Sequence, residues 1–455
     1  MADWPRCPPS DRTVCLLPPR PLHHKEEHTT IPPPSGNAVE GTTAVVESDE
    51  RVKITGGLRK LLWWMMPANL GVFILWGAIP GVLLPLQMES LDAAHKVANL
   101  ALVSTIGAFA AMIAQPIAGA VSDRTRSRFG RRAPWMVGGA VVGGLALIGL
   151  STGNSLVHIA IAWTMVQIAY NFVQGPLSAI LPDRVPVRAR GTFAAVGGAA
   201  AMLGALGGQI VGSALGHTIA PAYVGLAGLT LITTVLFVVF NPDASSKDAQ
   251  LPTFELADFL RTFWVSPVKH PDFAWAFIGR LLLYTGYFSV TGYNLYLLQD
   301  YIGLKGDALG YVPLLGLLSL VGMLPMIAIA GPISDRIGRR KIFVFISSVV
   351  VGLGLLIPWM WPTVGGMMAM SIVCGLGFGA FQSVDQALMT EVLPSADSFA
   401  KDLGVVNIAA TLPQTLAPGV GGAIVLAFTY AGLFPVGIVL SVLGAFAVFM
   451  IKSVK

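Results

Sequence analysis

The sequence GAVSDRTRSRFGRR at residues 119–132 returns in a shorter form, GPISDRIGRRK, at residues 331–341. The two stretches share a Gly, a Ser, an Asp and an Arg, and the members of each pair are 212 residues apart. A Leu-Pro pair at 181–182 and again at 393–394 has the same separation. Two landmarks at one separation indicate that the chain contains two related halves.

The residues around these stretches are mostly apolar. Of the 455 residues, 54% are hydrophobic and 12% are charged, whereas a soluble domain is about 25% charged. Apolar runs of about twenty residues are long enough to cross a bilayer core of about 30 Å. The composition therefore predicts an all-helical membrane protein with twelve spans, near residues 68–88, 97–121, 133–152, 156–181, 191–216, 221–240, 272–300, 310–333, 341–361, 364–392, 403–427 and 429–451.

The pattern of spans divides the chain into four parts. Residues 1–58 are rich in Pro, Ser, Thr and charge, and they predict a disordered cytoplasmic tail. Two six-helix bundles are expected at 59–240 and 272–455, joined by a cytoplasmic linker at 241–271. Cys7 and Cys15 lie in the tail and Cys374 lies in a span, so no disulfide framework or metal site is expected.

The distribution of Lys and Arg predicts the orientation of the spans. One face collects 26 of the 29 Lys and Arg residues, while the gaps on the other face hold only Lys96 and Lys305. Because cytoplasmic loops of membrane proteins are enriched in Lys and Arg, both termini are expected on the cytoplasmic side. We therefore expect a multi-pass protein of the cytoplasmic (plasma) membrane.

The repeated stretch resembles the signature loop of the major facilitator superfamily, Gly-x3-Asp-Arg-x-Gly-Arg-Arg. Residues 331–340 match it closely, and the longer loop at 119–132 is similar to that of the melibiose permease and sucrose-transporter-like branch. The stretch GVVNIAATLPQ at 404–414 also resembles a segment of sucrose-transporter-like members. The resemblance implies two pseudo-symmetric six-helix bundles that move a solute by alternating access, without a cofactor. The fourth span departs from sugar symporters of this kind, because it carries no Asp or Glu.

Charged residues at the cytoplasmic span ends are candidates for a latch between the bundles, since carboxylates there can bond the loop arginines. The resemblance implies that such a latch holds the outward-facing state. The expected members are Asp123, Arg124, Arg131, Arg132, Asp183, Asp335, Arg336, Arg339, Arg340 and Glu391.

Two charged residues lie well inside the predicted spans, Arg280 in the seventh and Asp385 in the tenth. Both lie about 12 Å from the cytoplasmic boundary, at about 1.5 Å of rise per residue. Since ionisable groups inside a membrane are costly and usually functional, we expect them to face each other or a shared cavity. They are candidates for proton coupling and gating, and a permanent structural ion pair is the alternative.

Amide and aromatic side chains in several spans predict a polar central cavity. Amides bond hydroxyl groups and aromatic rings stack on sugar faces, so the set favours a sugar or glycoside; each residue alone also fits a bond between helices. The candidate cavity residues are Trp76, Gln167, Tyr170, Asn171, Gln174, Tyr284, Tyr287, Asn294, Gln382, Gln386, Asn407 and Gln414.

Glycines at 204, 208, 212 and 216 form one small-residue face of the fifth span. Such faces allow two helices to approach closely. We expect this face to pack against a helix of the other bundle.

The function favoured by these features is secondary active transport of a small solute coupled to a proton, with sodium as the alternative ion. A proton-driven exporter of a drug or metabolite is the main alternative, and a receptor that has lost transport is a remote one. An enzyme is not expected, because the chain has no HExxH or Gly-x-Ser-x-Gly motif, and no Gly-rich loop with Lys-Ser/Thr for ATP. The bilayer and the solute are the expected partners, nucleic acid is not, and the protein is expected to be a monomer.

Overall fold

The computed structural model describes residues 54–247, 269–392 and 399–452, and for residues 390 and 399–410 it describes the backbone alone. All described residues belong to the compact unit Arg51–Lys455. The tail at 1–53 with Cys7 and Cys15, and linker residues 248–268, lie outside the described residues. So do Leu393-Pro394 and the side chain of Asn407.

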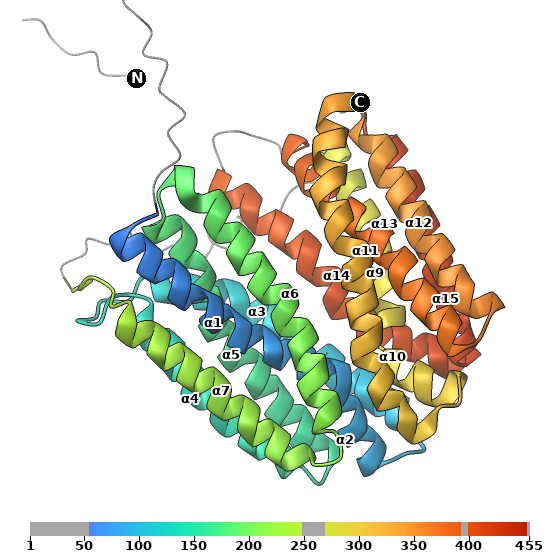
Figure 1. Cartoon of the computed structure of the whole chain (residues 1–455), viewed down its shortest axis with the longest axis horizontal. Helices are drawn as coiled ribbons and strands as arrows, with labels where there is room; N and C mark the ends of the chain where they lie inside the picture. Colours follow the sequence, from blue (N-terminus) through green and yellow to red (C-terminus); the bar gives the residue numbers. More distant parts are fainter. Residues whose placement is uncertain (1–53, 248–268, 393–398, 453–455) are drawn as a thin grey trace, which may run out of the picture. The chain divides into compact units, whose positions relative to one another are not determined.

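The first half of the chain forms one set of packed helices, drawn from blue to light green in Figure 1. In chain order these are α1 (Gly56–Ala78), the π-helix η1 (Ile79–Leu83), α2 (Leu84–Leu91), α3 (Lys96–Asp123), α4 (Ala133–Ser151), α5 (Leu156–Arg184), η2 (Val187–Ala189), α6 (Arg190–Ala214) and α7 (Ile219–Phe240). We call these helices the N half.

The second half forms the C half, drawn from yellow to red in Figure 1. It consists of α9 (Pro271–Thr291), α10 (Asn294–Tyr296), the π-helix η3 (Leu297–Tyr301), η4 (Lys305–Asp307), α11 (Ala308–Ile337), α12 (Arg340–Met360), α13 (Val364–Glu391), α14 (Phe399–Phe428), η6 (Tyr430–Gly432), α15 (Leu433–Ala447) and η7 (Val448–Met450).

Local sequence explains where several helices begin and end. Ser155 and Thr363 cap α5 and α13, their hydroxyls accepting bonds from backbone nitrogens three residues on. The glycine of each Gly-Arg-Arg adopts a left-handed conformation, with φ +84° at Gly130 and φ +68° at Gly338. Because side chains other than glycine are strained there, the repeated motif needs glycine at both positions to turn the chain into the next helix.

The two halves meet along two helix pairs, α3 with α14 and α6 with α11. At the first, a Cβ placed on Gly419 would lie 2.9 Å from the Thr105 hydroxyl oxygen. At the second, a Cβ placed on Gly316 of α11 would lie 3.2 Å from the side-chain amide carbon of Gln209 on α6. Glycine therefore allows close approach at both contacts between the halves.

Large apolar side chains cover much of the outer surface, among them Leu145, Ile161, Ile232 and Val321, each more than half exposed. Within the described ranges, twelve helices are long and apolar enough to cross a membrane. An apolar outer face on long helices is the arrangement that lipid requires. The predicted fold class, twelve transmembrane helices in two six-helix bundles, is confirmed.

Two predicted spans differ from the observed helices. The first begins at Gly56 rather than 68, because residues 56–67 continue the helix and Pro67 is accommodated inside it. The seventh, predicted as one span over 272–300, is broken at Gly292 and Tyr293 between α9 and α10. Apolar composition predicted where the chain crosses the membrane and carried no signal for this break.

The glycine face of the fifth span packs inside its own half, which corrects the expected contact with the other bundle. A Cβ on Gly204 would lie 2.7 Å from Phe73 Cβ, and one on Gly208 would lie 2.7 Å from the backbone nitrogen of Ala78, both on α1. Only Gly216 reaches the C half. A small-residue face predicts close approach but does not identify the helix that approaches.

Candidate functional site

A cavity of about 760 Å³ lies between the two halves, within the size range of small-molecule sites. The N half lines it with residues of α1, η1, α3, α5 and α6, and the C half with residues of α9, α10, α11, α13 and α14. The described residues that line it include amides, hydroxyls and aromatic rings, and none of them is Asp, Glu, Lys, Arg or His. The described lining can therefore hydrogen-bond and stack on a solute, and its side chains offer no charge to one.

The N-half wall contains one amide face of α5. Gln167, Asn171 and Gln174 all line the cavity, as their helical spacing predicts. The Trp76 indole nitrogen donates to Gln174 Oε1 at 2.8 Å, and the Trp76 ring meets the Trp163 ring edge-on at 6.4 Å between centroids. Trp76 is thereby held in one orientation at the cavity wall.

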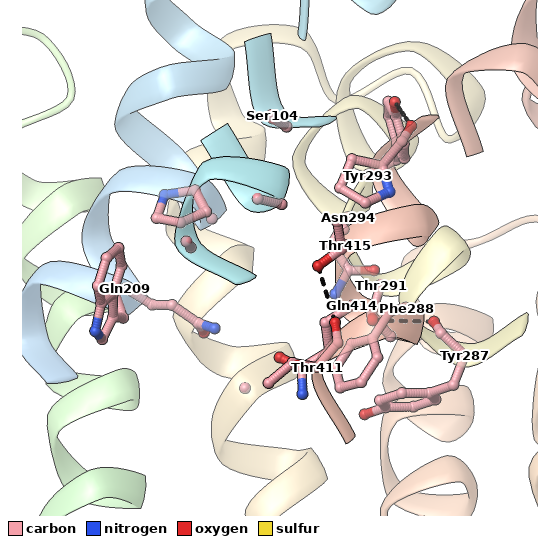
Figure 2. A pocket seen from close by; sticks show the side chains of 18 of the residues that line it. Ser104, Gln209, Tyr287, Phe288, Thr291, Tyr293, Asn294, Thr411, Gln414 and Thr415 are labelled. Atoms are coloured by element: carbon pink, nitrogen blue, oxygen red, sulfur yellow. Dashed lines mark hydrogen bonds between the residues drawn. The ribbon is translucent and has the colours of Figure 1, made fainter. Parts of the chain in front are cut away.

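The C-half wall is built around the break in the seventh span. Thr291, Gly292, Tyr293 and Asn294 span the break, and all four line the cavity. Interrupted helices at the middle of a transporter commonly carry its substrate site, because the break frees backbone groups and redirects side chains. Figure 2 shows Gln209 of the N half across the pocket from these residues.

A buried ion pair lies outside the cavity lining. Arg280 Nε lies 3.1 Å from Asp385 Oδ2, and the two side chains are 5% and 2% exposed. Arg280 also donates to Gln386 Oε1 at 3.4 Å and lies over the Tyr284 ring at 5.4 Å. The predicted mutual approach of α9 and α13 through these two charges is therefore observed, but neither residue is among those that line the cavity.

Four other expected cavity residues also lie away from its lining. Tyr170 is fully buried, and its hydroxyl shares a hydrogen bond with the Thr230 hydroxyl at 2.7 Å. Tyr284 is 4% exposed and packs on Phe378 at 5.2 Å between ring centroids. Gln382 and Gln386 are exposed, on faces of α13 that do not border the cavity. The expected members that do line it are Trp76, Gln167, Asn171, Gln174, Tyr287, Asn294 and Gln414.

Sequence reasoning missed several lining residues, including Ser104, Gln115, Trp163, Gln209, Thr291, Ser319, Ser371, Thr411 and Thr415. Gln115 and Gln209 are amides inside predicted spans, so the criterion that selected Gln167 would also have selected them. Serine and threonine gave no signal, because their hydroxyls often bond their own helix, as Thr415 does with the Thr411 carbonyl at 2.9 Å.

The signature-loop residues form a cluster in the N half. The Arg132 guanidinium lies 3.0 Å from Asp183, 2.5 Å from Asp123 and 2.5 Å from the Ser122 hydroxyl. Arg131 lies 2.7 Å from the same Asp183. Arg132 is therefore fixed by three side chains at the junction of α3, α4 and α5.

A related cluster occurs in the C half. Arg340 lies 2.9 Å from Asp335 and 2.6 Å from Glu391. Arg340 thus takes the place of Arg132, and Glu391 that of Asp183. These two pairs of equivalent residues are each 208 residues apart. The separation is shorter than the 212 residues of the Leu-Pro landmark because the first loop has four extra residues. We call the side that carries both clusters the signature-loop face.

The remaining expected latch residues are placed as follows: Arg124 is half-buried, while Arg336 and Arg339 are exposed. Among the described residues, the ion pairs of Arg131, Arg132 and Arg340 each join residues of one half. The latch role itself stays a prediction.

A polar cluster that sequence reasoning missed joins the halves at the opposite face. Lys96 Nζ lies 2.8 Å from Glu89 of its own half and 2.9 Å from Asp300 of the C half. Beside it, the His95 hydrogen bond lowers the pKa of the Asp92 carboxyl, and Asp92 also accepts bonds from the backbone nitrogens of Ala94 and His95. The sequence did offer a signal for Lys96, because Lys96 and Lys305 are the few Lys and Arg residues expected on this face.

Comparison with known proteins agrees with this architecture. The family model described as MFS/sugar transport protein matches residues 94–452, and the chain belongs to this family. The fold is also that of two solved transporters. The nucleoside transporter NupG superposes with a TM-score of 0.69 at 17% identity, covering 86% of this chain and 100% of that one. A D-xylose–proton symporter superposes with a TM-score of 0.66 at 14% identity, covering 88% and 98%.

Curated relatives match over shorter segments. The chain is 26% identical over 167 residues to the sucrose transport protein SUC4 of Arabidopsis thaliana, covering 33% of this chain and 32% of that protein. It is 26% identical over 172 residues to the sucrose transport protein SUT4 of Oryza sativa subsp. indica, covering 33% and 28%. It is 32% identical over 74 residues to the inner membrane symporter YicJ of Escherichia coli (strain K12), covering 15% and 16%. The matched segments thus span a third or less of these relatives' length.

Proposed function

We propose that this protein is a secondary transporter that moves a neutral, hydroxyl-rich solute, such as a sugar or glycoside, by alternating access. The observation that carries the proposal is the cavity of about 760 Å³, lined from both halves by uncharged amides, hydroxyls and aromatic rings. Amide and hydroxyl groups exchange hydrogen bonds with solute hydroxyls, while rings cover its apolar faces. The names of the sucrose transporters that it resembles agree with this class of solute.

The uncharged lining separates this proposal from export of a cationic drug. A buried cation is stabilised by an opposite charge, and its desolvation is costly without one. The described lining residues offer no carboxylate. Sugar phosphates and uronates are disfavoured for the same reason, because the described lining residues include no Lys or Arg to pair with them.

The test is uptake into proteoliposomes that contain the purified protein. Neutral mono- and disaccharides and glycosides are compared with sugar phosphates and amphipathic cations, under an imposed proton gradient and without it. We expect saturable uptake of a neutral sugar or glycoside. Transport confined to amphipathic cations would instead support the drug-exporter alternative.

We further propose that protons drive this transport through Asp385 and Arg280. The pair is a carboxylate with one guanidinium, buried within the membrane region at 3.1 Å, and protonation of Asp385 would release Arg280. A sodium ion is held by several oxygen ligands. The Asp385 carboxylate instead has the Arg280 guanidinium, itself a cation, as its partner.

Substitution of Asp385 tests this coupling. In an Asp385→Asn protein we expect solute exchange to continue while accumulation against a gradient is lost, since no proton is taken up at this site. A sodium gradient applied to the unmodified protein provides the comparison for the coupling ion. Accumulation at the unmodified level by Asp385→Asn would remove Asp385 from the coupling mechanism.

The orientation is proposed from charge. The signature-loop face carries Arg131, Arg132 and Arg340, and the excess of Lys and Arg supports a cytoplasmic position for this face. The opposite face, with Lys96, then lies outside the cell. We propose a monomer in the plasma membrane, since the cavity is completed by the two halves of one chain.

A further inference from the structure

Lys96 lies where the two halves meet at the opposite face. It is the first residue of α3, and its ammonium group contacts Glu89 at the end of α2 and Asp300 in η3. The Lys96 side chain is 11% exposed, against 32% and 35% for the two carboxylates. A shielded ammonium between two carboxylates is screened less by water and salt than an exposed pair.

Neighbouring hydrogen bonds cross the same interface. Gln299 of the C half donates to Glu89 at 3.0 Å, and the Tyr296 hydroxyl donates to the Pro85 carbonyl at 2.8 Å. The Tyr430 hydroxyl donates to Asp300 at 2.6 Å and fixes this carboxylate from within the C half. We call Glu89, Lys96, Gln299, Asp300 and Tyr430 the opposite-face cluster.

The charges of the cluster give Lys96 a role that neither carboxylate shares. Two carboxylates, one from each half, are held together by one ammonium. Removing Asp300's charge loses one attraction and leaves the pair of Lys96 with Glu89. Removing the charge of Lys96 instead leaves Glu89 and Asp300 as like charges on opposite sides of the interface, so attraction between the halves becomes repulsion.

The described ion pairs of Arg132 and Arg340 differ from that of Lys96 in the halves that they join. The described pairs of Arg132 and Arg340 at the signature-loop face each stay within one half. The described pair between Lys96 and Asp300 joins the halves. Opening the opposite face by rocking the halves apart would therefore have to break this pair.

We propose that Lys96 is the residue that closes the cavity at the opposite face and sets the balance between its two access states. The proposal concerns regulation of the cavity and rests on the proposed transport function. The balance between states follows the difference in their contacts, and Lys96 contributes a contact between the halves that exists only while this face is closed.

The experiment measures access to the cavity directly. Ser104 lines the cavity, so Ser104→Cys is introduced after the native cysteines are replaced by Cys7→Ser, Cys15→Ser and Cys374→Ala. A membrane-impermeant maleimide is added to sealed vesicles of either orientation, and the labelling rate is measured from each face. This readout needs no substrate, so it succeeds or fails separately from the transport assay.

A graded series of charge changes follows. From the Lys96 side, labelling should rise least in Asp300→Asn, more in Lys96→Gln and most in Lys96→Glu, with about a tenfold increase in the last. A Glu at this position suits the first turn of a helix, so α3 should still form. The exchanged pair, Lys96→Glu with Asp300→Lys, again places one ammonium between two carboxylates and should return labelling toward the parent rate.

The exposed Lys305 provides the matched control, because Lys305→Gln removes a positive charge from the same face away from the cluster. Its labelling should equal that of the parent. Size-exclusion profiles of each variant report folding. Equal labelling across the Lys96 series would overturn the proposal, as would an exchanged pair that labels like Lys96→Glu, or a Lys305→Gln protein that matches Lys96→Gln.

Discussion

Arg280 and Asp385 depend on each other for their burial. With side chains 5% and 2% exposed, each is the counter-ion of the other at 3.1 Å. Removing one member of a buried pair strands the other charge at a cost of about 3–5 kcal/mol, whereas removing both is far less costly. We therefore expect Arg280→Met to lower the thermal unfolding midpoint, and Arg280→Met with Asp385→Asn to recover most of the loss.

The same pair of variants separates a structural role from a coupling role. If the pair only stabilises the fold, the double variant should accumulate solute like the unmodified protein. If it couples transport to protons, the double variant should fold and exchange solute without accumulating it. Unfolding midpoints and proteoliposome accumulation, measured on the same preparations, distinguish the two.

Gln174 holds the Trp76 ring in position through one hydrogen bond. Its Oε1 accepts from the Trp76 indole at 2.8 Å, so Gln174→Leu should release the ring and leave its N–H without this partner. The loss of one such bond is about 1 kcal/mol, or about fivefold in apparent affinity for the transported solute. Gln382, an amide of the C half outside the cavity lining, is the control, and Gln382→Leu should leave the affinity unchanged in a solute-binding assay.

At the scale of helices, α6 offers a direct comparison of two glycines. A Cβ at Gly208 would lie 2.7 Å from the Ala78 backbone nitrogen, whereas one at Gly198 would meet nothing within 4 Å. Gly208→Ala should force α1 and α6 apart and destabilise the protein by about 1–3 kcal/mol. Gly198→Ala should be neutral or stabilising, since alanine favours helix by about 1 kcal/mol.

Thermal unfolding in detergent measures both variants. Equal midpoints for Gly208→Ala and Gly198→Ala would contradict the packing of α6 on α1.

The sequence predicted the helices better than it predicted their faces. Apolar length and charged ends marked the spans, whereas the left-handed turns at Gly130 and Gly338 were found only in the structure. The α5 amides followed helical spacing into the cavity, but Tyr170, close to them in sequence, turned to Thr230 instead. This hydrogen bond of Tyr170 depends on a residue of α7 that is sixty residues further along the chain. No local sequence pattern predicts it.

At the scale of the whole molecule, the two halves can be fixed together by chemistry. A Cβ at Gly419 of α14 would lie 3.9 Å from Thr105 Cβ of α3, which suits a disulfide, since bonded cysteines have Cβ atoms about 3.5–4.5 Å apart. Thr105→Cys with Gly419→Cys, in a background without the native cysteines, should crosslink on mild oxidation. Solute uptake should stop and return on reduction.

Each single cysteine variant is the control for reactivity without a crosslink. Full transport by the oxidised double variant, with the crosslink verified by mass spectrometry, would contradict motion of the halves at this contact.

The arrangement of the halves could be inferred only in part from the sequence. The repeat predicted two related bundles, and amide and aromatic side chains in several spans predicted a polar cavity. The cross-half contacts of Lys96 with Asp300 and of α3 with α14 join residues far apart in the chain. These contacts form in one arrangement of the two bundles. The composition and periodicity of the sequence are the same whatever that arrangement is, so they could not predict the contacts.

The longer first signature loop is hydrogen-bonded to the segment that follows α7. Ser246, after α7, accepts from the Ser127 backbone nitrogen at 3.0 Å and donates to the Thr125 carbonyl at 2.9 Å. Ser246 thus ties the end of the described N half to this loop, next to the Arg132 cluster. A force applied at Ser246 would act first on the loop between α3 and α4, where Asp123 and Asp183 bond Arg132.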